Sequence, residues 1–145
     1  MTELVQLLRT LLATNFTLFL KTQMFHWNVE GSDFPQYHEF FADAYGDFYA
    51  QNDVLAEYIR IQNQYAPGSL SVYSQLSEVK DEEGFPAATG MMTQLAIDNQ
   101  TMISLYQQLF DVAEAAREHG ISDYASQRLD AHKKLAWMLR SILKA

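Results

Sequence analysis

The sequence has 145 residues, of which 18 are acidic and 10 are basic, so its formal net charge is −8. This charge balance argues against a protein that binds nucleic acid through a basic surface. The absence of cysteine excludes disulfides, thiolate catalysis and cysteine-ligated metal sites, and it fits the reducing cytoplasm that we expect as the location. We expect one domain over residues 1–145, without a signal peptide or an apolar run of about 18 residues that could span a membrane.

Breaks in the helix-favouring sequence fall at four places that each contain glycine or proline: residues 31–33, 65–69, 81–86 and 119–122. The stretches between them predict four long helices and one short one, over residues 3–29, 34–62, 70–77, 89–118 and 122–143. Gly31 is expected to end the first long helix and Gly120 the third, because glycine is the usual residue after a helix. Pro35 fits the first turn of the second.

The connections between these helices predict how they pack. Short links favour antiparallel neighbours, whereas the link over residues 63–87 is long enough to cross from one end of a bundle to the other. A four-helix bundle with one long central crossover is the ferritin-like topology. The sequence therefore predicts an all-α, ferritin-like four-helix bundle whose crossover carries a short helix.

Two of the four histidines lie close together in the sequence. His26 falls in the last turn of the first predicted helix, and His38 falls in the first turns of the second. A histidine at either place can be a metal ligand, or it can satisfy a helix terminus or fill an aromatic pocket. For a single histidine the structural interpretation is the stronger one.

The second predicted helix also carries Asp53 and Glu57, four residues apart. This spacing places both carboxylates on one helix face, close enough to share a cation. The alternatives are a solvated face, or a pair between Glu57 and Arg60. Considered alone, the carboxylate pair favours these structural alternatives.

Helix geometry decides whether the histidines and the carboxylates can cooperate. His38 and Asp53 are separated by about 22 Å along one helix, so they cannot bind the same ion within one chain. A two-fold axis across the middle of this helix would place the histidines of one copy beside the carboxylates of another. A mixed imidazole–carboxylate set suits first-row metals such as iron.

A longer motif joins these residues: His26-Trp27-Asn28-Val29-x-Gly31, then Phe34 and His38, then Asp53-x-x-Ala56-Glu57. This motif resembles that of the Dps family, the mini-ferritins known as DNA-binding proteins from starved cells. Residues 132–140, which begin with His-Lys and continue to Ala-Trp-Met-Leu-Arg, are similar to the last helix of the family. The resemblance covers nearly the whole chain.

The resemblance implies a hollow homo-dodecamer that oxidises Fe(II) with hydrogen peroxide or O2 and stores Fe(III) mineral, protecting the cell against oxidative stress. It also implies ferroxidase sites at two-fold interfaces, so the protein would be an enzyme with iron as its substrate. By position, His26 and His38 match the metal ligands and catalytic residues from one chain. Asp53 and Glu57 match those from its partner, and Glu57 matches the residue that can bridge two irons.

Two departures from the family motif bear on function. The family usually has an aspartate one turn after the second histidine, where this sequence has Ala42; Asp43 is adjacent but about 100° around the helix. The second iron position therefore lacks a ligand. The chain also has no lysine before Lys21, whereas many DNA-binding members carry a lysine-rich tail. The alternatives are a DNA-compacting shell with weak or no ferroxidase activity, or a shell that acts only as a scaffold.

Overall fold

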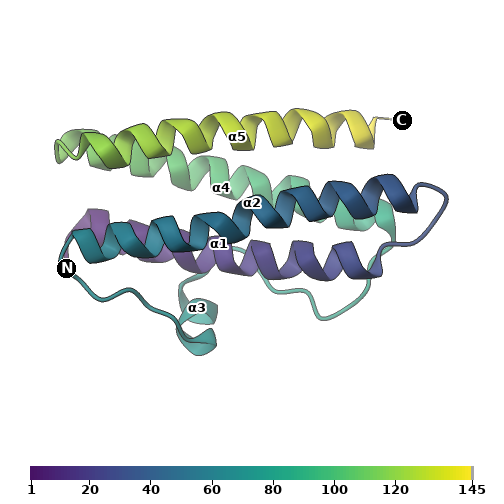
Figure 1. The fold of residues 1–145 in the computed structure, drawn as a ribbon, viewed down its shortest axis with the longest axis horizontal. Helices are drawn as coiled ribbons and strands as arrows, with labels where there is room; N and C mark the ends of the chain where they lie inside the picture. The colour runs from purple at the N-terminus through teal and green to yellow at the C-terminus, as the bar shows by residue number, and fades with distance from the viewer. Residues whose placement is uncertain (145) are drawn as a thin grey trace.

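Four long helices lie side by side and a fifth, short helix lies outside them (Figure 1). The structure is a computed structural model that describes residues 1–144. The helices are α1 (Glu3–Asn28), α2 (Phe34–Ile61), α3 (Leu70–Leu76), α4 (Ala88–Ala115) and α5 (His119–Leu143). None of them is both long enough and apolar enough to cross a membrane, within the residues described.

The order of the helices confirms the predicted ferritin-like topology. Helices α1 and α2 form one antiparallel hairpin, α4 and α5 form another, and α1 also packs against α4. The chain between α2 and α4 runs along the outside of the bundle and carries α3, which packs against α1. The all-α, four-helix bundle expected from the sequence is therefore present, with the short helix in its crossover.

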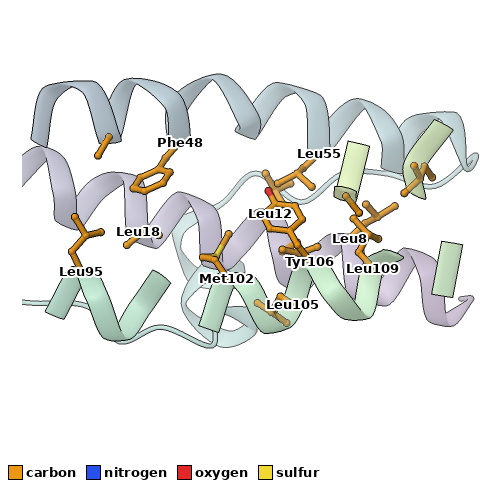
Figure 2. Packing of buried hydrophobic residues seen from close by; sticks show 14 of the residues in the cluster. Leu8, Leu12, Leu18, Phe48, Leu55, Leu95, Met102, Leu105, Tyr106 and Leu109 are labelled. Carbon is orange, nitrogen blue, oxygen red and sulfur yellow. The ribbon is translucent and has the colours of Figure 1, made fainter. Parts of the chain in front are cut away.

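The core is formed by apolar side chains that recur at helical spacing on the inward faces. Figure 2 shows side chains of α1, α2 and α4 meeting in the centre, among them Leu12, Phe48 and Tyr106, which are all at most 1% exposed. Burial of each such side chain contributes about 1.5–3 kcal/mol to folding. This continuous core fixes the positions of the outward-facing residues on α1 and α2.

A buried polar contact holds α1 and α2 in register with each other. The side-chain amide of Asn15 donates to the backbone carbonyl of Phe48 at 2.8 Å and to the side-chain oxygen of Asn52 at 2.7 Å. Asn15 is fully buried, so breaking these bonds would leave polar groups without water. The contact therefore determines which residues of α2 lie beside the end of α1.

Most predicted helix ends agree with the structure, but the ends assigned to the two glycines were wrong. Pro35 lies in the first turn of α2, as expected, whereas α1 ends at Asn28 with an extended Val29, and Gly31, with φ +122, lies in the loop beyond it. Gly120 does not end a helix either, because α5 already begins at His119. Arg117 takes the left-handed conformation instead, with φ +58, and the amide of Glu118 donates to the carbonyl of Ala113. This backbone bond ends α4 without a glycine.

Candidate metal centre

The fold brings His26 and His38 into direct contact. His26 lies in the last turn of α1 and His38 in the first turns of α2, and a short loop joins the two helices. The two imidazole rings stack with their centroids 3.8 Å apart and an interplanar angle of 13°. Both residues are half-buried, so the ring edges remain reachable from the surface.

Two reciprocal hydrogen bonds fix the orientation of these rings. Nδ1 of His26 lies 2.6 Å from the carbonyl oxygen of His38, and Nδ1 of His38 lies 2.7 Å from the carbonyl oxygen of His26. Because a carbonyl oxygen only accepts, each Nδ1 must carry the proton. In the neutral rings each Nε2 then has a free lone pair, which is the state that binds a metal ion.

Aromatic rings enclose the histidine pair on both sides. Phe34 lies against His38, with ring centroids 4.9 Å apart, and Tyr45 lies against His26, with centroids 5.2 Å apart. Such neighbours restrict rotation of the imidazoles, so a ligand pair would be held in place before a metal arrives. Tyr45 is not among the site residues predicted from the sequence. Its spacing of seven residues from His38, which places both on the same side of α2, is the signal that could have identified it.

The carboxylates of Asp53 and Glu57 lie on the exposed surface of α2, towards its C-terminal end. Glu57 was a possible partner of Arg60, but Arg60 donates to the carbonyl of Gln64 at 3.0 Å and lies over the ring of Tyr65 at 4.8 Å. The guanidinium group is therefore engaged elsewhere.

The histidine pair and the carboxylate pair do not meet within one chain. Residues 38 and 53 lie on one continuous helix, so about 22 Å separates them along its axis. Over residues 1–144, no three side chains of His, Cys, Asp or Glu come together in a way that could hold an ion. Within one chain, the histidine pair and the carboxylate pair are therefore two separate groups of potential ligands.

Neither Ala42 nor the adjacent Asp43 can supply the carboxylate that the family motif has after its second histidine. Ala42 has no donor atom, and Asp43 lines a groove between α2 and α5 together with Asp47 and Phe48. That groove lies on the side of α2 that faces α5, whereas the histidines lie beside α1. Asp43 is therefore directed away from the histidine pair.

Trp27, beside His26, is 63% exposed. It lines a shallow pocket with Asn28, Val29, Glu30 and Phe85. The core of its own chain therefore does not cover this side chain. The indole lies on a surface that another subunit could cover.

The sequence analysis missed a polar network that crosses the bundle from α2 through α5 to α4. Arg128 pairs with Asp47 through two hydrogen bonds, at 3.0 and 2.6 Å, and also donates to Nε2 of His132 at 3.2 Å. Nδ1 of His132 donates to the side-chain oxygen of Asn99 at 2.6 Å. The spacing of Arg128 and His132, four residues apart on one helix, is the signal that could have indicated a contact.

The contacts of His132 in this network leave it no nitrogen for a metal ion. Burial, followed by the charge of Arg128, lowers the pKa of His132 to about 3, so this histidine is neutral at physiological pH. Both of its ring nitrogens are occupied by hydrogen bonds, and a buried guanidinium cation lies beside them. A cation placed beside His132 would be repelled, so this buried histidine is not a metal ligand.

Comparison with known proteins identifies the class. Residues 5–145 match the family model of the ferritin-like domain, so the chain belongs to the ferritin-like family. It is 30% identical over 142 residues to a low temperature-induced protein of Nostoc sp., covering 97% of this chain and 79% of the relative. It is 29% identical over 139 residues to the DNA protection during starvation protein of Helicobacter pylori, covering 95% and 96% of the two chains.

Similar solved structures indicate which family of ferritin-like proteins the chain belongs to. The Dps protein of Vibrio cholerae O1, described as a ferritin-like diiron-carboxylate protein, matches with a TM-score of 0.94 at 26% identity, covering 98% of this chain and 89% of that one. A Dps protein of Bacillus brevis matches with a TM-score of 0.92 at 26% identity, covering 99% and 100%. Together with the ferritin-like family model, these matches place the protein in the Dps family.

Proposed function

We propose that this protein is a mini-ferritin that oxidises Fe(II) at inter-subunit sites and deposits Fe(III) mineral inside a hollow dodecamer. Hydrogen peroxide or O2 is the oxidant, and removal of both Fe(II) and peroxide protects the cell against oxidative stress. One observation carries the proposal. Hydrogen bonds hold the imidazoles of His26 and His38 with the proton on Nδ1. The exposed carboxylates of Asp53 and Glu57, which have no ion-pair partner among residues 1–144, lie towards the other end of α2.

A two-fold axis across α2 would complete the site. The midpoint between residues 38 and 53 falls between Tyr45 and Gly46, so an antiparallel copy would place each histidine pair beside a carboxylate pair. Gly46 is exposed, and a Cβ atom added there would meet no other atom within 4 Å. Tyr49, 64% exposed, lies one turn further along the helix. A bare glycine beside an exposed aromatic ring favours close approach of a second copy.

The ligands divide into two positions. His26 would bind the first iron with Asp53 and Glu57 of the partner subunit, and water would complete its coordination. His38 would bind the second iron, with Glu57 of the partner subunit bridging the two. Each Fe(II) gives one electron to hydrogen peroxide, which takes up two protons and leaves as two water molecules. Both irons become Fe(III), which hydrolyses to form the mineral.

Surface charge favours iron storage over DNA compaction. Each chain carries a formal charge of −8, and twelve copies would repel a polyanion while attracting Fe(II). The acidic composition of the chain therefore suits storage of iron mineral better than binding of DNA.

Mixed oligomers give the sharpest test. One variant, His26→Ala with His38→Ala, keeps only the carboxylate half, and the other, Asp53→Asn with Glu57→Gln, keeps only the histidine half. Each variant alone should be inactive. After unfolding and refolding together at equal amounts, about a quarter of the wild-type oxidation rate should return, because half of the dimers are mixed and each restores one of its two sites. No recovery in co-assembled shells would contradict shared sites.

The solution mass provides the second measurement. The subunit has a mass of 16.6 kDa, so a dodecamer has a mass of about 200 kDa. A monomer that still oxidises iron at micromolar concentration would exclude both the shell and the assignment of ligands.

A further inference from the structure

At the histidine end of the proposed site, the second iron position lacks the oxygen ligand that the family motif supplies. Ala42 offers none, and Asp43 is turned towards the groove against α5. Any oxygen supplied by this chain must come from another side chain on the same side of α2 as His38.

Tyr45 meets that requirement. It follows Ala42 by three residues, which places it 60° around the helix from Ala42, towards His38, whereas Asp43 lies 100° in the opposite direction. Its ring centroid is 5.2 Å from that of His26, at an interplanar angle of 55°, and its other ring contact is with Phe19 at 6.1 Å. Tyr45 is half-buried, so it is held beside the histidines rather than free in solvent.

We propose that Tyr45 is an oxygen ligand for Fe(III) at the histidine end of the inter-subunit site, in place of the carboxylate that Ala42 cannot supply. This inference rests on the proposed function. The His26 ring that Tyr45 contacts is stacked on His38 with centroids 3.8 Å apart, so the phenol lies beside the pair of imidazoles and close to the position that His38 would supply. A metal bound to imidazole lies about 2 Å from the nitrogen. As the Fe–O bond forms, the phenolic proton leaves to solvent.

A phenol ligand, unlike a carboxylate ligand, changes the oxidation state of iron that this position prefers. A phenolate oxygen is a hard, anionic donor, and Fe(III) attracts it more strongly than Fe(II) does because its charge is higher. Tyrosine serves as a ligand of ferric iron in catalase. Tyr45 should therefore retain Fe(III) after oxidation and contribute little to the capture of Fe(II).

Tyr49 provides a matched control on the same helix. It lies seven residues after Ala42, about 10 Å along the axis, and it contacts Phe19 with ring centroids 5.3 Å apart. Among the described residues, its ring has no stacking contact with either histidine. A change at Tyr49 therefore removes a phenol from the same surface without removing the one beside His26.

The test measures the visible phenolate-to-Fe(III) charge-transfer absorption and the phenolate vibrations by resonance Raman spectroscopy. The assembled protein is loaded either with Fe(II) followed by peroxide, or directly with Fe(III)–nitrilotriacetate. We expect the absorption in the wild type and in Tyr49→Phe, and a loss of at least tenfold in Tyr45→Phe. Anaerobic Fe(II) affinity should change by less than twofold in Tyr45→Phe.

The outcomes separate this inference from the proposed function. If the wild type oxidises iron but shows no phenolate signal, Tyr45 is not a ligand and the ferroxidase proposal stands. A signal that persists in Tyr45→Phe, or that disappears in Tyr49→Phe instead, also overturns the role of Tyr45. If Fe(II) is not oxidised while direct Fe(III) loading gives the signal, the site binds ferric iron and the ferroxidase proposal fails. Because the signal is read from the wild type first, a Tyr45→Phe variant that misfolds does not remove the test.

Discussion

His26 and His38 each donate a hydrogen bond from Nδ1 to the backbone carbonyl of the other, at 2.6 and 2.7 Å. The carbonyl of His26 lies in the last turn of α1, where backbone carbonyls lack a partner within the helix. The side chain of His38 therefore completes the end of α1 while it orients its own ring. The structural and ligand interpretations of these histidines are thus compatible. Nδ1 of each ring donates to a backbone carbonyl, and Nε2 of each ring can still bind a metal ion.

The carboxylates should be required for iron binding but not for assembly. Asp53→Asn and Glu57→Gln keep the shape of each side chain and remove its charge, so each should weaken Fe(II) binding about tenfold or more. Anaerobic titration with Fe(II) and stopped-flow oxidation measure the effect. Asp130→Asn, an exposed acid on α5, is the matched control and should behave as the wild type. Unchanged oxidation in both site variants would mean that this face is merely solvated.

The fold was predictable from the sequence because local signals and packing agree. The predicted second helix, residues 34–62, differs from Phe34–Ile61 by one residue, and the predicted crossover contains α3 as observed. The end of α4 was not predictable from the preference for glycine after a helix. Arg117 adopts the left-handed conformation that this preference assigned to Gly120. A backbone bond from Glu118 to Ala113 offsets the cost of that conformation.

The candidate site was only partly predictable. Spacing along the helices predicted that the histidines and carboxylates would be separated, because that depends on helix rise alone. The reciprocal hydrogen bonds and the contact of Tyr45 with His26 depend on how α1 and α2 cross, which the sequence does not specify. The ion pair of Asp47 with Arg128 of α5 likewise depends on how these helices pack, which the spacing of residues along α2 does not indicate.

The buried His132 should make the stability of the fold depend on pH. Its pKa is lowered from 6.5 to about 3 by burial and by Arg128, so in the pH range between these values the unfolded chain binds more protons than the folded one. The contribution of His132 to the free energy of unfolding is therefore fully present above about pH 6.5. It falls by up to about 1.4 kcal/mol per pH unit as the pH drops towards 3.

The measurement is denaturant unfolding at pH 7, 6 and 5 in the wild type and in His132→Gln. The variant should be less stable at pH 7, because it disturbs the bonds to Asn99 and Arg128. Its stability should nevertheless change less with pH. His119→Gln, at an exposed histidine, should keep the wild-type slope. Equal slopes in all three proteins would exclude His132 as the titrating group.

The assembled protein should not bind duplex DNA strongly at physiological salt. Neutralising phosphates requires lysine and arginine, and each chain carries 10 such residues against 18 acids. Gel-shift assays with and without magnesium measure the affinity, since a divalent cation could bridge two anionic surfaces. Submicromolar binding without magnesium would contradict the charge argument and favour a DNA-compacting role.

Ala42 should make the two iron positions unequal. In the proposed site, the first position would have His26 and two carboxylates from the partner subunit, whereas the second would have His38 and only the shared Glu57. We therefore expect one well-filled position near His26 and a weaker one near His38 when Fe(II) is limiting. Peroxide takes two electrons, so a weakly filled second position should slow its reaction.

Installing the missing ligand tests this directly. Ala42→Asp should fill the second position and speed peroxide-driven oxidation severalfold at low iron, because a carboxylate one turn after His38 adds a charged oxygen donor. Ala42→Asn adds the same volume without the charge and is the control, so it should remain close to the wild type. Anomalous diffraction from iron-soaked crystals gives the occupancies, and stopped-flow absorbance gives the rates. If the wild type already has equal occupancies and Ala42→Asp brings no gain, the alanine has no effect on the site.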